Sequence, residues 1–479
     1  MRQGLLLLLA LSVGCELTND SPPADTPVPT VDPRWDIDVA SHPGEVFGDD
    51  DDATDPIGDD DDSTDEEVPV EVVLPDVMAD QITLDVIPLP EASPGGFASY
   101  GTFEVGSLNP RSYHAPLDDG RIWAGWRTVS GTGTVARIDG DAIDLQVTFP
   151  ERDVHGLVAI EDGGFGVLLR GLDATDTEGS PLNMWLGRYS ATGTEIWTTK
   201  LTAGTLIPYH EVGGQTVMGD SRLAYGNDRF VAYYTVYNEA NGHHGDQVRY
   251  VDANGTMSGQ GWDWGCSHST SQLVTWHPAE DRFVPLCVSD TYPAYGVMAW
   301  RDAGRAIFSA GSAENGLVSA VLGGVADRPL GGWIVSFNAV DRPIAPAQGA
   351  AIREIDLDGY PVGDTTWLTE TYGEQERDTV IARVGPDDGP ELYLVGWRVT
   401  TEDPQFMLGI IDPTGAFVVE PQNVFDMGIP FADRILWGRR DDSFRRNTDG
   451  SVTWTWLGWP NDSIRSFRFA LDVVEATTE

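Results

Sequence analysis

The sequence is long, strongly acidic and poor in basic residues. Its 479 residues carry 76 Asp and Glu against 29 Lys and Arg, which gives a formal net charge of -47. Such a charge repels phosphate backbones and anionic lipid surfaces, so the composition argues against a nucleic-acid binder and against a polybasic membrane-surface protein. The 16 Trp and 16 Phe argue against disorder of the whole chain. The length allows two to four ordinary domains or one large repeat architecture.

The first fifteen residues predict an export signal that is removed from the mature chain. Arg2 supplies a positive charge, Leu5–Leu11 form an apolar run that is too short to span a bilayer, and small residues lead to Cys15. The stretch Ser12-Val13-Gly14-Cys15 resembles the lipobox of bacterial lipoproteins, in which a peptidase cuts before the cysteine and the thiol carries diacylglycerol. The resemblance implies a signal peptide over residues 1–15 and a lipid anchor on Cys15 as the membrane contact. The alternative is ordinary secretion with a free Cys15.

Residues 16–67 predict a disordered, extended tether. They hold nineteen carboxylates against one Arg, a charge of -18, and include the runs Asp49–Asp52 and Asp59–Asp62. Self-repulsion keeps such a segment extended. The phrase Gly-Asp-Asp-Asp-Asp-Ala-Thr-Asp at 48–55 resembles the Asp-rich linkers of lipoproteins from Gram-negative bacteria, which implies a cell-envelope location, periplasmic or at the surface. The Asp runs could also trap Ca²⁺ loosely, but they lack the ligand pattern of a formed calcium loop.

Residues 68–479 form the predicted folded domain, and their pattern is all-β. Short runs rich in Val, Ile, Tyr, Trp and Thr alternate with Gly and Asp turns, without a long helical period. One turn recurs seven times. From the copy at Asp119 to the copy at Asp449 is 330 residues in six steps, or 55 residues per unit. The apolar strands after these turns begin at Ile122, Phe165, Phe230, Phe283, Trp333, Leu392 and Thr453.

A second turn recurs with the same spacing and completes the prediction of a β-propeller. From Gly140 to Gly415 is 275 residues in five steps, again 55 residues per unit. Two hairpin turns and four short strands per unit describe a propeller blade, so seven units predict a seven-bladed β-propeller. The hairpin at Tyr189–Trp197 resembles those of bacterial β-propeller repeat proteins. The seventh unit lacks a fourth strand, which the N-terminal part of the domain is expected to supply. The candidate segments are Val70–Val73, Ile82–Ile87 and Phe97–Val105.

Sequence motifs of several enzyme classes are missing. The chain contains no Gly-Lys-Ser/Thr phosphate loop, no Gly-x-Ser-x-Gly elbow and no His-Glu-x-x-His zinc motif. A propeller hosts many unrelated activities, so its function has to be sought in the residues that the topology brings together.

The two cysteines of the folded domain, Cys266 and Cys287, admit two interpretations. With Cys15 lipidated they remain as a pair, which suits an oxidising compartment. If strands at 269–276 and 282–289 pair, Cys287 lies opposite about residue 272. Cys266 is then roughly 20 Å away along an extended strand, whereas a disulfide needs α-carbons about 4.4–6.8 Å apart. A disulfide therefore requires a fold-back at Gly265, and two reduced or buried thiols are the alternative.

The histidines gather on one face of the predicted propeller. The connections into the innermost strands and the loops between second and third strands share this face, the loop face. The recurring hairpin turns share the other, the turn face. Six of the seven histidines in the domain belong to the loop face, and only His277 abuts the turn face. We expect His114, His155 and His268 just before innermost strands, His210 in a connection, and His243 and His244 in a loop.

Three interpretations of the loop face stay open. Neutral imidazole and carboxylate groups suit a divalent metal, with Zn²⁺, Cu²⁺, Mn²⁺ and Ca²⁺ as candidates. The same residues could form a metal-free ligand pocket, or they could line the channel mouth as structural hydrogen-bond partners. The metal ligands would be His114, His155 and His268, with His243, Asp246 and Asp290 beside them. The further residues expected around the mouth are Arg222, His244, Arg377 and Arg434.

The sequence thus predicts an exported, lipid-anchored β-propeller that binds a ligand, glycan or protein partner of the cell envelope on its histidine-rich face. One alternative is a metal-dependent hydrolase or lyase that uses the same face. Another is a structural interaction protein of the envelope.

Overall fold

The computed structural model describes most of the folded domain, within the unit Glu66–Glu479. The export signal, Cys15 and the whole tether lie outside the described residues, so the expectations about them stay predictions. No helix in the described part of the chain is long and apolar enough to cross a bilayer. The described ranges are 70–93, 112–171, 183–202, 206–208, 221–238, 243–262, 266, 272–289, 296–300, 304–309, 320–340, 348–369, 375–400, 405–424, 442–458 and 462–475.

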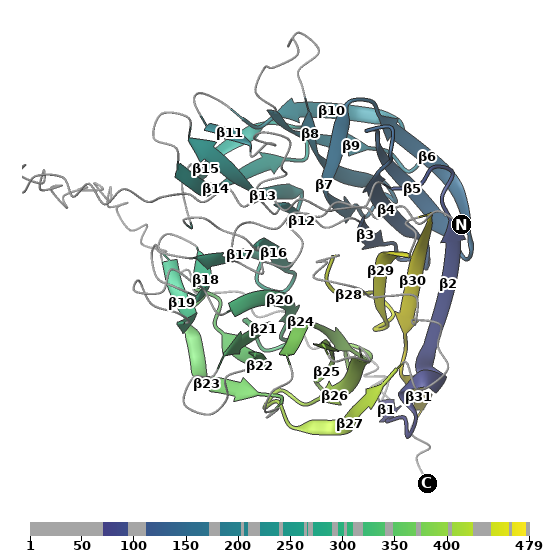
Figure 1. Ribbon diagram of the computed structural model, residues 1–479, viewed down its shortest axis with the longest axis vertical. Helices are drawn as coiled ribbons and strands as arrows, with labels where there is room; N and C mark the ends of the chain where they lie inside the picture. The colour runs from purple at the N-terminus through teal and green to yellow at the C-terminus, as the bar shows by residue number, and fades with distance from the viewer. Residues whose placement is uncertain are drawn as a thin grey trace, which may run out of the picture. The chain divides into compact units, whose positions relative to one another are not determined.

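Seven antiparallel sheets, each with four main strands, form the blades (Figure 1). From inside outward, blade 1 holds β3 (Ser112–Pro116), β4 (Ile122–Arg127), β5 (Gly133–Asp139) and β6 (Ala142–Phe149). Blade 2 holds β7 (Arg152–Ala159), β8 (Phe165–Gly171), β9 (Asn183–Tyr189) and β10 (Glu195–Lys200). Blade 3 holds β12 (Ser221–Gly226), β13 (Arg229–Asn238), β14 (His243–Asp252) and β15 (Met257–Trp262), and β11 (Leu206–Pro208) also pairs with β13.

The next three blades repeat this order. Blade 4 holds β16 (Gln272–His277), β17 (Arg282–Ser289), β18 (Gly296–Trp300) and β19 (Gly304–Ser309). Blade 5 holds β20 (Ala320–Asp327), β21 (Trp333–Val340), β22 (Gln348–Ile355) and β23 (Pro361–Trp367). Blade 6 holds β24 (Gln375–Val384), β25 (Leu392–Thr400), β26 (Gln405–Ile411) and β27 (Phe417–Asn423).

Blade 7 joins the two ends of the folded domain. Its first three strands are β28 (Arg445–Arg446), β29 (Val452–Gly458) and β30 (Ser463–Phe469), and its outermost strand is β2 (Ile82–Pro88). Of the three candidate closing segments, the one at Ile82–Ile87 therefore completes the blade. Val70–Val73 forms β1, which pairs instead with β31 (Asp472–Glu475), and Phe97–Val105 lies outside the described residues. A 3-10 helix at Met78–Gln81 links β1 to β2.

The innermost strands close a ring. Contacts run from β3 through β7, β12, β16, β20 and β24 to β28, and both β28 and β29 contact β3. Figure 1 shows the seven sheets around the common centre that these contacts define. The seven-bladed, four-stranded propeller predicted from the 55-residue period is thus confirmed, because the period counts one sheet per unit.

The recurring turns explain the regular spacing. In the β14–β15 hairpin, Asp252 Oδ1 accepts hydrogen bonds from the backbone N–H groups of Asn254 and Thr256, both at 2.9 Å. Gly255 completes this turn at φ 86°, a conformation that glycine adopts without a steric penalty. Each such turn reverses the chain within a few residues, so the next strand pairs with the one before it.

Burial differs between the strands of a blade. The second strands are buried on both faces because each blade packs between two neighbours, and β8 has no exposed residue. The outermost strand β6 instead alternates between exposed and half-buried residues. Aromatic side chains such as Trp333 and Phe337, both 0% exposed, fill the space between blades. Burying one such side chain contributes about 1.5–3 kcal/mol, so packing between the sheets stabilises the fold.

Candidate functional site

His114 lies inside β3 rather than just before it. Its side chain is 0% exposed, and its Nε2 lies 3.2 Å from the backbone oxygen of Thr453 in blade 7. Its Nδ1 lies 4.0 Å from Asp442 Oδ2. Burial lowers the pKa of His114 to about 4, although the nearby Asp442 carboxylate acts in the opposite direction. The imidazole is therefore neutral at pH 7, and its Nε2–H donates to Thr453.

His155 also lies inside its strand, β7, and contacts a different blade. It is 5% exposed, and its Nδ1 lies 3.4 Å from Ser221 Oγ in blade 3. Burial lowers the pKa of His155 well below its usual value, and the positive charges of Arg170, Arg127 and Arg222 lower it further. The expectation that both histidines open onto the loop face is thus corrected, because innermost strands extend further than the sequence pattern indicated and bury them.

The other predicted residues are placed as follows. Arg222 in β12 is 1% exposed and lies inside the channel rather than at its mouth. His243 and His244 begin strand β14, in register with Asn238 and Tyr237, and are not part of a loop as expected. Arg377 belongs to β24 and is half-buried. The expected site residues outside the described part of the chain are Cys15, His210, His268, Asp290 and Arg434.

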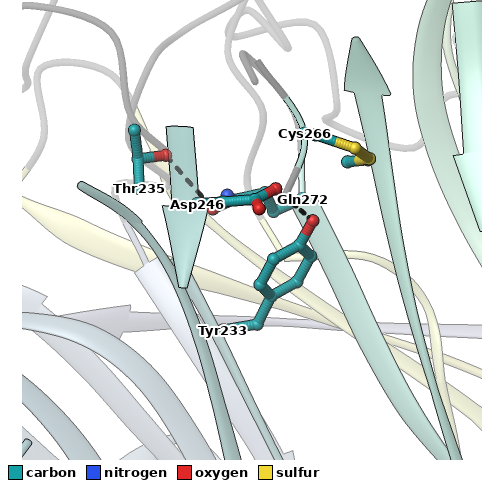
Figure 2. Close-up of a disulfide and its surroundings, with 6 residues drawn as sticks. Tyr233, Thr235, Asp246, Cys266 and Gln272 are labelled. Atoms are coloured by element: carbon teal, nitrogen blue, oxygen red, sulfur yellow. Dashed lines mark hydrogen bonds between the residues drawn. A yellow bond between two sulfur atoms is a disulfide. The ribbon is translucent and has the colours of Figure 1, made fainter. Parts of the chain in front are cut away.

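Cys266 and Cys287 form a disulfide, with α-carbons 6.7 Å apart (Figure 2). The expected register is present, since Cys287 is paired with Gln272. The disulfide therefore places Cys266 beside β17, as the expected fold-back requires. Asp246 lies beside the disulfide and accepts a hydrogen bond from the Tyr233 hydroxyl. Within the described residues, these two sulfurs and the Asp246 carboxylate are the one His, Cys, Asp or Glu cluster tight enough for a metal. In the disulfide the sulfurs are joined to each other, and neither is a thiolate ligand.

Asp442 is the centre of a buried charge cluster in the channel. Its side chain is 0% exposed, and Arg445 donates to both of its carboxylate oxygens at 3.1–3.2 Å. The backbone N–H groups of His114 and Ser443 also donate to it, at 3.5 and 3.1 Å. Arg222 reaches from blade 3, with its Nε 3.7 Å from Asp442 Oδ1. Burial alone would raise the pKa of Asp442, but Arg445, His114 and Arg222 outweigh it and lower the pKa.

A cavity of about 180 Å³ adjoins this cluster. Its walls come from the innermost strands of blades 4, 5 and 6 and from the start of blade 7. Thr275, Asp327, Arg383 and Arg446 lie toward the turn-face ends of β16, β20, β24 and β28. The cavity therefore lies nearer the turn face than the loop face on which the sequence placed the site. The polar lining residues are Thr275, Asp327, Arg383, Asp442, Ser443, Arg445 and Arg446.

Several buried donors in this wall have no hydrogen-bond partner within the described part of the structure. They are the Nε atoms of Arg383, Arg445 and Arg446 and the hydroxyl of Ser443. Arg383 is 5% exposed and Ser443 is 8% exposed. A buried polar group without a partner costs about 1–3 kcal/mol, but these four atoms are almost fully covered, so a ligand would reach them only after a shift of the wall. The lining offers guanidinium, carboxylate and hydroxyl groups, which are suited to hold a polar molecule.

The cavity lies outside the site predicted from the sequence, although the chain carries a signal for it. Arg439, Arg440, Arg445 and Arg446 place four of the 29 basic residues within eight positions. In so acidic a protein, that local excess of positive charge indicates a specific role. The partner strand residue Arg383 gives no such signal, because only the ring brings β24 beside β28.

Comparisons with known proteins give only distant structural likenesses. The sequence matches no protein-family model and no curated protein. An α-L-arabinanase of Penicillium chrysogenum complexed with arabinobiose is 11% identical with a TM-score of 0.42, over 80% of this chain and 97% of that one. The six-bladed fucose-recognising lectin of Aleuria aurantia is 9% identical with a TM-score of 0.34, over 77% and 96%. The PQQ-bound aldose sugar dehydrogenase of Streptomyces coelicolor is 11% identical with a TM-score of 0.35, over 82% and 98%. At these values the likeness carries no argument about ligand or activity.

Proposed function

We propose that this protein is a lipid-anchored binding protein of the bacterial cell envelope whose propeller holds a small polar ligand in the channel cavity. The observation that carries the proposal is the cavity itself. Residues from four blades line a partly open space of about 180 Å³, and charged side chains are among them. A space of this size holds more than a single water molecule, which needs roughly 10–15 Å³.

A small ligand fits the site better than a protein partner or a long glycan. Arg383 and Ser443 are 5% and 8% exposed, so a flat partner surface does not reach their polar atoms. His114 and His155 are equally remote, because they are 0% and 5% exposed. Ligand sites of this kind are concave and combine apolar walls with a few placed polar groups. Here the apolar walls are Leu273, Val274, Val325, Ala326, Ala382 and Phe444.

The anchoring part of the proposal rests on the sequence. The lipobox-like stretch at Ser12–Cys15 supports a lipid on Cys15, and the -18 charge of residues 16–67 supports an extended acidic tether. Together they support a propeller held away from a membrane, where a soluble ligand reaches its channel.

The proposal is tested by filling the cavity. Half-buried Thr275 lines it from β16, so Thr275→Phe should occupy part of the space. We would screen sugars, sugar acids, amino acids and nucleosides against the wild type by thermal unfolding, then measure hits by calorimetry. A ligand at 100 times its Kd stabilises the folded state by about 2.7 kcal/mol, which raises Tm by a few degrees. Thr275→Phe should abolish that rise.

The matched control is Thr83→Phe, on the exposed side of β2 in the outermost position of blade 7. It adds the same aromatic ring away from the channel and should bind like the wild type. Equal binding by Thr275→Phe and Thr83→Phe, or no stabilising compound in any class, would refute a ligand site in the cavity.

A further inference from the structure

The cavity carries a surplus of positive charge in a protein of net charge -47. Three guanidinium groups line it, from Arg383, Arg445 and Arg446, against the two carboxylates of Asp327 and Asp442. Asp442 is already paired with Arg445 at 3.1 Å and faces Arg222 at 3.7 Å. Asp442 therefore does not neutralise the positive charges of Arg383 and Arg446.

Arg383 and Arg446 share a single exposed carboxylate. Arg383 Nη1 donates to Asp387 Oδ1 at 3.1 Å, and Arg446 Nη2 lies 2.8 Å from the same oxygen. The Asp387 side chain is 73% exposed, whereas those of Arg383 and Arg446 are 6% and 18% exposed. Solvent weakens ion pairs with so exposed a partner, so two largely buried arginines have only one screened anion between them.

Some donors in this wall are not hydrogen-bonded within the described part of the chain, and their atoms are almost fully covered. Arg383 uses its two Nη atoms on Asp387, through Oδ1 and the backbone oxygen, and its Nε has no partner in the described part of the chain. The same holds for the Nε of Arg446 and for the Ser443 hydroxyl. A carboxylate accepts several hydrogen bonds from guanidinium and hydroxyl groups at once, and such charge-assisted bonds are stronger than neutral ones.

The rest of the lining limits the charge and character of the ligand. Asp327 and Asp442 would repel a second negative charge, so a monoanion suits the cavity better than a phosphate monoester. Asp327 and Thr275 lie on blades 5 and 4, away from Arg446 on blade 7, and they offer an acceptor and a hydroxyl to ligand O–H groups.

We propose that the ligand is a small hydroxylated carboxylic acid, with its carboxylate bound by the guanidinium groups of Arg383 and Arg446 and its hydroxyl groups toward Asp327 and Thr275. This inference rests on the proposed function, since it names the chemical class of the ligand in the same cavity.

Matched acid and neutral pairs test the inference on the wild-type chain. We would measure calorimetric Kd values at fixed ionic strength for glucuronate against glucose, galacturonate against galactose, and gluconate against glucitol, with glucose 6-phosphate as the dianion. At least one acid should bind, and its neutral partner and the phosphate should bind at least about tenfold more weakly. Tenfold is a modest threshold, because it corresponds to only about 1.4 kcal/mol.

Charge-removing variants locate the carboxylate. Arg383→Gln and Arg446→Gln should each weaken the acid at least about tenfold and leave the weak binding of the neutral sugar unchanged. The control is Arg282→Gln, because the Arg282 side chain is 40% exposed, pairs with Asp358 and is not part of the cavity lining. It should bind the acid like the wild type. The comparison of acid with neutral partner stands even if a cavity variant fails to fold.

The possible failures are distinguishable. Neutral sugars or the phosphate binding as well as the acids, with loss in Thr275→Phe, would overturn the carboxylic-acid inference and leave the cavity as a ligand site. Acid binding that survives both Arg383→Gln and Arg446→Gln would overturn the assignment of the carboxylate position. If no compound of the wider screen stabilises the wild type, the proposed function fails, and this inference with it.

Discussion

The two sides of the channel are both polar, and a cavity adjoins one of them. On the side of blades 1–3, His114 and His155 are neutral and buried, and each has one ring nitrogen placed against an oxygen of a neighbouring blade. On the side of blades 4–7, Arg383, Arg446 and Ser443 line the cavity. Buried polar atoms without a partner in the described structure occur on both sides, for example His114 Nδ1 and Arg383 Nε. Polar residues and unsatisfied groups along a propeller axis are thus no sign of a site in themselves, whereas space lined by charged side chains is a more specific sign.

Removing the buried Asp442 carboxylate should have the largest effect on the free energy of unfolding. Asp442 pairs with Arg445 and Arg222 and accepts the N–H of His114, all in a buried position. Asp442→Ala leaves these guanidinium groups uncompensated, so we expect a loss of about 3–5 kcal/mol in the free energy of unfolding. Urea titration with a fluorescence readout would measure it.

Asp387→Ala is the matched control, at an exposed carboxylate on the side of blades 4–7. Its carboxylate also contacts two arginines, but it is 73% exposed, so its removal should cost less than about 1 kcal/mol. Equal losses for Asp442→Ala and Asp387→Ala would contradict the contrast between a buried and a solvated cluster.

Acid should destabilise the folded protein through the two histidines on the side of blades 1–3. The pKa of His114 is lowered to about 4 by burial, and that of His155 is lowered well below its usual value. The unfolded chain binds these protons near pH 6.5, so the folded state is at full stability above that pH and loses it as the pH falls toward 4. For His114 alone the loss is roughly 3 kcal/mol at about 1.4 kcal/mol per pH unit.

The measurement is the free energy of unfolding between pH 7.5 and 4.5 for the wild type and for His114→Gln with His155→Asn. These amides keep a donor or acceptor near the original ring nitrogens but do not titrate. The double variant should show a flatter pH dependence over this range. Parallel curves for the two proteins would mean that other groups cause the acid sensitivity.

The smallest effect on stability should come from removing the hydroxyl group of Ser443, on the side of blades 4–7. Ser443 has a buried Oγ without a partner in the described residues, so Ser443→Ala should change the stability by less than about 1 kcal/mol, in either direction. Ser336, 0% exposed, donates to the backbone oxygen of Thr379 at 2.9 Å, and Ser336→Ala should cost about 1–2 kcal/mol. Thermal and urea unfolding of both variants would decide whether the two hydroxyls differ as described.

Much of the fold could be predicted because each blade repeats a local pattern. The turn at Asp252–Gly255 and the strand starting at Phe165 are set by neighbouring residues, so their 55-residue spacing is visible in the sequence. The register of β16 with β17 followed from the short turn between them, as the pairing of Gln272 with Cys287 shows. The choice of β2 over β1 as the closing strand was not visible, since both segments have β-strand patterns.

The site was harder to predict because it depends on contacts between blades. The topology correctly assigns strands to positions in the ring, but it does not give the depth of a side chain within the channel. His114 and His155 were expected at the loop face and are buried within strands. Asp442 joins Arg222, 220 positions away, and Arg383 joins Arg446 through Asp387. Neither pairing has a local signature.

Blade 7 can close only after its C-terminal strands have been synthesised. Gln81, next to β2, donates to Asp472, which is 391 residues later in the chain. At synthesis rates of about 5–20 residues per second, β2 exists for roughly 20–80 s before its partner strand β30 is made. Throughout that interval its edge offers unpaired backbone groups to other chains. The last strands to emerge therefore decide both when the ring closes and how long a newly made chain is exposed to aggregation.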